Sequence, residues 1–135
     1  ARHEVKASMR LPFDSQAVSI TPHMHLLGRE MRVTATYPDG KKENLVWIKD
    51  WDYRWQDTYI YKAPVKLPRG TLLEMFAYFD NTTNNPLNPN NPPKLVTFGE
   101  ETTDEMAFAF VEFTMDQEPA GNPFRPNRLF APRPQ

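Results

Sequence analysis

The chain has 135 residues, enough for one domain with a substantial hydrophobic core. Its 16 basic and 17 acidic residues leave a net charge of -1, which gives no electrostatic reason to expect nucleic acid or an anionic membrane as a partner. It has no cysteine, which excludes disulfides, thiolate nucleophiles and zinc fingers. No signal-peptide pattern is recognised at its start, and membrane insertion is not expected because no apolar run is long enough.

The first part of the chain is predicted to consist of strands, because apolar and polar side chains alternate in it. The turns Pro38-Asp39-Gly40 and 66–70 separate some of these strands, since proline presets one backbone dihedral and glycine accepts the left-handed one. Pro22 interrupts one strand, which favours an edge position or a bulge just before the histidines that follow it. The predicted strands of this part are 3–11, 17–27, 31–37, 44–48 and 71–79.

The remainder begins with the Asn- and Pro-rich segment 80–93, which we interpret as a long surface loop built from Asx-turns. An alternative is that Asn81 is a glycosylation acceptor. A short edge strand is expected at 94–98 and a last strong strand at 104–114. Many short strands and turns with one weak helical candidate predict an all-β antiparallel sandwich over 1–115, followed by a Pro-rich extended tail over 116–135.

The most informative motif is the run 22–28, Pro-His-Met-His-Leu-Leu-Gly. On a strand, His23 and His25 point to the same side, so that two imidazoles provide half of a metal site. Met24 and Leu26 would then face the core, and the histidines would face outward or into a cleft. The alternative is that both are ordinary polar side chains on an exposed face.

A third ligand is expected from Met106, which directly follows the polar run 102–105. The alternative is that Met106 fills the core together with Phe108 and Phe110. Two imidazoles and one thioether form a soft ligand set that suits copper, particularly Cu(I), over zinc, calcium or magnesium. Because no thiolate is available, blue-copper electron transfer is disfavoured, and a mononuclear copper with open positions is expected.

The motif His-Xaa-His-Xaa-Xaa-Gly at 23–28, with Thr-Xaa-Asp-Glu-Met at 102–106, resembles the C-terminal domain of the copper type II, ascorbate-dependent monooxygenases. That family includes peptidylglycine α-hydroxylating monooxygenase and dopamine β-monooxygenase. The similarity spans 17–114. The form Pro-His-Met-His-Leu-Leu-Gly-Arg at 22–29, together with the Asn- and Pro-rich loop, looks more like bacterial relatives than the animal enzymes. It implies a jelly-roll-like sandwich, one copper per chain that activates O2 to hydroxylate a C–H bond, and a periplasmic or secreted location. The ligands that it implies are His23, His25 and Met106.

The chain also departs from the family. Family enzymes have a second copper, on three histidines of an N-terminal domain, and His3 is the only other histidine here. The resemblance therefore implies a partner domain that donates electrons. Positions that hold the carboxylate of a peptide substrate in the amidating enzyme are Thr21, Phe108 and Phe110 here, which indicates a small-molecule substrate that is more apolar.

Two further residues could contribute to this site. His3 could be a solvated residue, a fourth ligand, or part of a second site with Glu4. Asp104 could orient a ligating imidazole through its carboxylate.

Two other functions remain open. Trp47, Trp51 and Trp55 recur every four residues, so an exposed aromatic platform would suit a carbohydrate- or ligand-binding module, whereas buried tryptophans would be core. The third hypothesis keeps the copper without catalysis, as a domain that stores, senses or delivers Cu(I).

Overall fold

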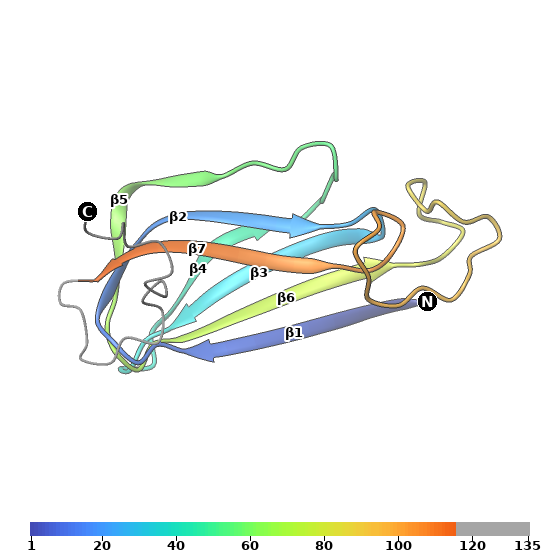
Figure 1. The fold of residues 1–135 in the computed structure, drawn as a ribbon. Coiled ribbons are helices and arrows are strands. Elements are labelled where there is room, and N and C mark those ends of the chain that lie inside the picture. Colours follow the sequence, from blue (N-terminus) through green and yellow to red (C-terminus); the bar gives the residue numbers. More distant parts are fainter. Residues whose placement is uncertain (116–135) are drawn as a thin grey trace, which may run out of the picture.

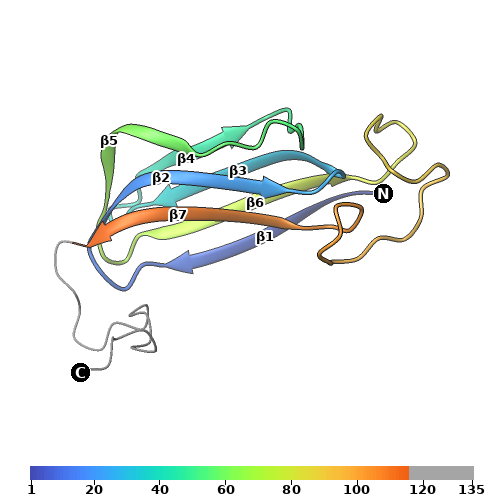
Figure 2. The same ribbon diagram turned by 45° about the horizontal axis from the view of Figure 1, so that its top comes forward.

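The computed structural model describes residues 1–115, which form seven strands in two antiparallel sheets (Figure 1). One sheet has the order β1-β6-β3-β4 and the other the order β5-β2-β7, and the two stack face to face (Figures 1 and 2). The strands are β1 (Arg2–Arg10), β2 (Ser15–Met24), β3 (Gly28–Thr36), β4 (Lys42–Ile48), β5 (Tyr59–Leu67), β6 (Leu72–Asp80) and β7 (Ala107–Met115). The all-β sandwich is confirmed, and the predicted tail 116–135 lies outside the described residues.

Within residues 1–115 there is no helix, and therefore none that could cross a membrane.

Two clusters of buried side chains fill the space between the sheets, as the period-two alternation of the strands predicts. The first cluster occupies one end of the sandwich and includes Ile20 and Val33. The second includes Met24, Leu27 and Trp51, and it lies directly beneath the end of β2 that carries the histidines. Burial of one such side chain contributes roughly 1.5–3 kcal/mol to the free energy of folding, so apolar packing stabilises this end of β2.

Of the two alternatives predicted for Pro22, the edge position holds locally and the bulge does not. β2 is the central strand of its sheet, and its bulge lies between Ala17 and Ser19, so the predicted bulge next to the histidines is wrong. β5 pairs with β2 only as far as Ile20, whereas β7 continues to pair with it as far as Met24. At Pro22 the strand therefore has a partner on one side only, which spares the ladder hydrogen bond that proline cannot donate.

Two other element predictions were incomplete. β5 was missed because most of its residues are exposed on both faces and Pro64 interrupts it, so that no alternation is visible. The short strand expected at 94–98 is wrong, since the segment contributes only one isolated parallel bridge, between Phe98 and Glu105.

The sandwich is open along the edge between β1 and β7. All nine residues of β1 are exposed, because the three-stranded sheet places no strand opposite it. Met9 of β1 and Val111 of β7 line an apolar groove of about 350 Å³ along this edge. Contacts that cross the edge therefore decide how firmly β1 is held to the opposite sheet.

The long loop 80–93 is built from Asx-turns, as predicted. The side-chain oxygens of Asn85 and Asn88 accept hydrogen bonds from the backbone N–H groups of Leu87 and Asn90, at 3.0 and 2.9 Å. The side-chain amide of Asn81 donates to the backbone oxygen of Lys94 at 2.8 Å, which gives it a structural role in closing the loop.

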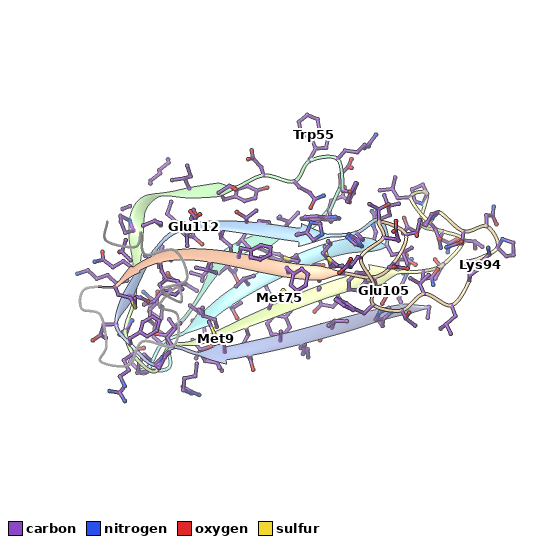
Figure 3. The ribbon with its side chains drawn as sticks, viewed as in Figure 1. Met9, Trp55, Met75, Lys94, Glu105 and Glu112 are labelled. Carbon is purple, nitrogen blue, oxygen red and sulfur yellow. The ribbon has the colours of Figure 1, made fainter. Side chains whose placement is uncertain are left out.

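The three tryptophans do not form a row. Trp51 is buried in the second core cluster, whereas Trp55 is 79% exposed on the segment that joins β4 to β5 (Figure 3). Trp47 lies one residue before the end of β4, where its indole N–H donates to Glu30 at 2.7 Å and Arg32 and Lys49 lie over its ring. The segment 49–58 is neither helix nor strand, so the expected shared face of the three tryptophans does not exist.

Candidate metal centre

The register between β2 and β7 brings most of the predicted site residues to one face. Thr21 lies opposite Phe110, and His23 lies opposite Phe108. Directly opposed residues of antiparallel strands point to the same side of a sheet. Since the neighbouring Met24 is fully buried in the core, these four side chains occupy the outer face of the three-stranded sheet.

The pairing continues past the end of β2. The backbone N–H of His25 donates to the oxygen of Met106 at 3.2 Å, and that of Leu26 donates to Thr102 at 3.3 Å. These two bonds join the loop 101–106 to the residues just after the strand. The structure thus brings His25 and Met106 together, although 81 positions separate them in the sequence.

His25 lies just beyond β2 and is only 4% exposed, so the prediction that it lies on a strand is wrong by one residue. Chain reversal begins here, because the N–H of Gly28 donates to the oxygen of His25 at 2.9 Å. As a result Leu27, rather than the predicted Leu26, joins the core. The rings of His23 and His25 nevertheless lie together, with centroids 5.0 Å apart and planes at 87°.

Hydrogen bonds determine which nitrogen of His23 carries the proton. The side-chain nitrogen of Gln56 donates to the backbone oxygen of Tyr53 at 2.9 Å, and a carbonyl can only accept. The amide oxygen of Gln56 must then be the atom that lies 2.6 Å from Nδ1 of His23. Because that oxygen is an acceptor, Nδ1 of His23 carries the hydrogen and Nε2 keeps its lone pair.

The same reasoning applies to His25. Its Nδ1 lies 3.2 Å from the backbone oxygen of Asp104, which can only accept, so this nitrogen is also the donor. Within residues 1–115 neither Nε2 atom has a hydrogen bond to another residue. Ligating histidines commonly donate from one ring nitrogen to a carbonyl or carboxylate and bind metal through the other. The His pair has this arrangement twice.

The role expected of the Asp104 carboxylate is wrong, because its backbone oxygen contacts His25 instead. The carboxylate accepts from the N–H of Glu101 at 3.3 Å and lies against Gly99. A Cβ atom at Gly99 would lie 2.6 Å from Cγ of Asp104, so only glycine allows this approach. Gly99 therefore helps to place the carbonyl that orients His25.

Met106 is half-buried, immediately before β7. It is absent from both core clusters of the described residues, so the core-filler alternative receives no support from them. Among the described residues, no three or more His, Cys, Asp and Glu side chains are grouped as metal ligands. Met106 belongs to a different residue type, and its thioether with two imidazoles is the soft set that suits Cu(I).

His3 contacts Glu105, the residue directly before Met106, rather than the His pair. Its Nε2 is 2.9 Å from a carboxylate oxygen of Glu105, and its ring stacks on Phe79 with centroids 5.4 Å apart. The suggested second site with Glu4 is not formed, since the Glu4 carboxylate pairs with Lys6 at 2.6 Å.

Exposed aromatic rings extend from the His pair across the same face. Phe108 stacks over His23 with centroids 6.5 Å apart, and it contacts Phe98 at 6.5 Å and Phe110 at 5.8 Å. Phe98, Phe108 and Phe110 are 71%, 41% and 59% exposed. The hydroxyl of Thr21 bonds that of Thr58 at 2.8 Å beside this surface. Three exposed phenylalanine rings next to the imidazoles form an apolar surface that is suited to bind an apolar molecule.

Comparison of the chain with models of protein families and with curated protein sequences finds no match. Two residues of the centre were missed by sequence reasoning, namely Gln56 and Tyr53. Both lie in the irregular segment between β4 and β5, whose path over β2 no local pattern predicts (Figure 1).

Proposed function

We propose that His23, His25 and Met106 hold one copper ion, and that this domain is the O2-activating half of an ascorbate-dependent type of monooxygenase that hydroxylates a C–H bond. One observation carries the proposal. Both imidazoles donate from Nδ1 to atoms that can only accept, so two Nε2 lone pairs are available on rings 5.0 Å apart.

The bound copper would supply one-electron redox chemistry with O2. The chain's own residues would set its conditions: the two imidazoles hold the ion in either oxidation state, and the thioether favours Cu(I). The ring of His25 is held in place by its burial and by its hydrogen bond to the backbone oxygen of Asp104. The Gln56 amide holds the other.

We propose a small apolar molecule as the substrate. Phe108 and Phe110 have exposed rings on the same face as the imidazoles, and the hydroxyl of Thr21 is hydrogen-bonded to that of Thr58. None of these three side chains carries a positive charge that would bind a carboxylate. A substrate carried on this surface would present its C–H bond beside His23.

A partner must supply the electrons. His3 is the only histidine outside the pair and is bonded to Glu105, so a second copper on three histidines would have to come from another domain or protein. By the same resemblance to the monooxygenases, we propose a periplasmic or secreted location.

A direct test measures metal content and oxygen consumption of the purified chain. We expect one copper per chain, a type II EPR signal after oxidation, and O2 uptake with ascorbate once an electron-donating domain is supplied. The matched control is the His23→Ala/His25→Ala double variant, which should retain the fold and lose both signals. A wild-type chain that binds no metal ion in stoichiometric amount would contradict the proposal.

A Cu(I) storage or delivery domain is the second candidate, and it is favoured by the presence of only one candidate centre in the described chain. It predicts tight Cu(I) binding and transfer of the ion to a competing chelator. It also predicts no O2 uptake with ascorbate, whichever electron-donating domain is added. The O2 measurement therefore separates the two functions.

A further inference from the structure

We infer that His3 and Glu105 together are positioning residues for Met106, and that they set the preference of the centre for Cu(I). This inference rests on the proposed function, in which the thioether of Met106 is a copper ligand.

The geometry of the pair supports a fixed contact. Glu105 precedes Met106 directly, and its side chain reaches across the open edge of the sandwich to β1 (Figure 3). There its carboxylate lies 2.9 Å from Nε2 of His3 and is only 16% exposed. The His3 ring is itself held by stacking on Phe79, which is buried in the second core cluster. The contact therefore joins the loop 101–106 to the opposite sheet, at a ring that packs on a core residue.

Backbone hydrogen bonds tie Glu105 to its other neighbours. Its N–H donates to Thr97 at 3.0 Å, and its oxygen accepts from Gly99 at 3.3 Å. The next residue, Met106, accepts from His25. Glu105 is thus the point where β1, the segment 97–99 and the candidate centre meet.

Met106 has more need of such support than the histidines have. Each imidazole is oriented by its own hydrogen bond, to Gln56 or to Asp104. A methionine side chain has three rotatable bonds and a neutral sulfur with no strong hydrogen bond to orient it. Its position therefore depends on how firmly the backbone at 105–106 is held. Since thioethers favour Cu(I), loosening that backbone should weaken Cu(I) binding more than Cu(II) binding.

The test compares Cu(I) and Cu(II) dissociation constants of the full chain, measured by competition with chelators, for wild type, His3→Ala and Glu105→Gln. We expect each variant to weaken Cu(I) binding by about tenfold, as loss of an outer contact of a metal site commonly does, with Cu(II) affinity unchanged. Lys6→Ala is the matched control, because Lys6 lies on the same strand and its ammonium contacts Glu4 and the Phe76 ring rather than Glu105.

A double-variant comparison separates positioning of Met106 from a general structural role. In a Met106→Ile background the effect of His3→Ala on Cu(I) affinity should disappear, because the ligand that it positions is gone. Equal losses of Cu(I) and Cu(II) affinity, or a His3→Ala effect that persists without Met106, would overturn the inference. A wild-type chain that binds no copper would contradict the proposed function as well. Copper binding that both variants leave unchanged would contradict the positioning role alone.

Discussion

The amide oxygen of Gln56 lies 2.6 Å from Nδ1 of His23, across 33 positions of sequence. Gln56 belongs to the irregular segment between β4 and β5, whereas His23 belongs to the central strand of the sheet. Because the Gln56 amide is itself fixed by the backbone oxygen of Tyr53, the contact determines the tautomer of the imidazole. A segment without regular structure thereby controls which nitrogen is free to bind a metal.

Replacement of Gln56 by Leu removes the acceptor and keeps a side chain of similar size. We expect copper affinity to fall roughly 10- to 100-fold, with little change in thermal stability, because ring orientation is lost and the core is untouched. Chelator competition and thermal unfolding would measure the two effects. Asp57→Asn on the same segment is the control, since its carboxylate accepts only from the adjacent Thr58 N–H. Equal affinities of wild type and Gln56→Leu would exclude this role.

Replacement of Met106 by Ile exchanges the thioether for a hydrocarbon of similar volume. We expect the circular dichroism spectrum to be preserved and Cu(I) affinity to fall by at least an order of magnitude, since the soft ligand is lost. Met9→Ile serves as the control, because Met9 is 46% exposed on β1 (Figure 3). If Cu(I) affinity is the same with and without the Met106 sulfur, Met106 is not a ligand.

A methyl group at Gly28 would disturb the turn that follows His25. Its Cβ would lie 2.8 Å from Cβ of Met24, closer than side chains pack, and Met24 is fully buried. We expect Gly28→Ala to lower the free energy of unfolding by about 1–3 kcal/mol. Denaturant unfolding of the metal-free chain measures this.

Gly40→Ala provides the comparison for that experiment. Space around Gly40 is open, but its φ of +88° is strained for alanine, so about 1 kcal/mol is expected. Because this turn lies away from the histidines, only Gly28→Ala should also reduce copper affinity. Equal copper affinities of the two variants would contradict the importance of the turn at Gly28.

Tyr61 should make the fold sensitive to alkali. Burial, together with the nearby Glu43 carboxylate, raises the pKa of the Tyr61 hydroxyl from 10.0 to about 12, and the hydroxyl donates to Leu45 at 3.0 Å. A tyrosine whose pKa is higher in the folded state stabilises the fold fully below pH 10, and this contribution is lost as the pH rises from 10 to 12. Unfolding free energies across that range should fall less steeply for Tyr61→Phe than for wild type. Parallel slopes would contradict the assignment.

Much of the fold could be predicted because burial on one face imposes a period of two. Strands β3, β6 and β7 alternate in this way, and each was found close to its observed bounds. β5 has little burial on either face, so the hydrophobic effect left no pattern in its sequence. The sequence could not decide between an edge position and a bulge at Pro22, because the one-sided pairing there depends on how far β5 extends.

The candidate centre was predictable only in its side-chain types. Spacing put His23 and His25 on one side of the chain, and the polar run before Met106 indicated the end of a strand. The group that orients His25 is the backbone carbonyl of Asp104, and every residue carries a carbonyl. Sequence therefore cannot distinguish it from the carboxylate that was expected. The contact of His3 with Glu105 depends on the opposed edges of two sheets, which only the tertiary structure provides.

Copper binding by the two imidazoles is tested most directly by a Cu(I) titration of the purified chain against a chromophoric chelator, in parallel with the His23→Ala/His25→Ala variant. We expect one tightly bound Cu(I) per wild-type chain and none in the double variant, with the same strand content in both. Copper binding that is absent from wild type, or that survives the loss of both imidazoles, would contradict a copper site on His23 and His25.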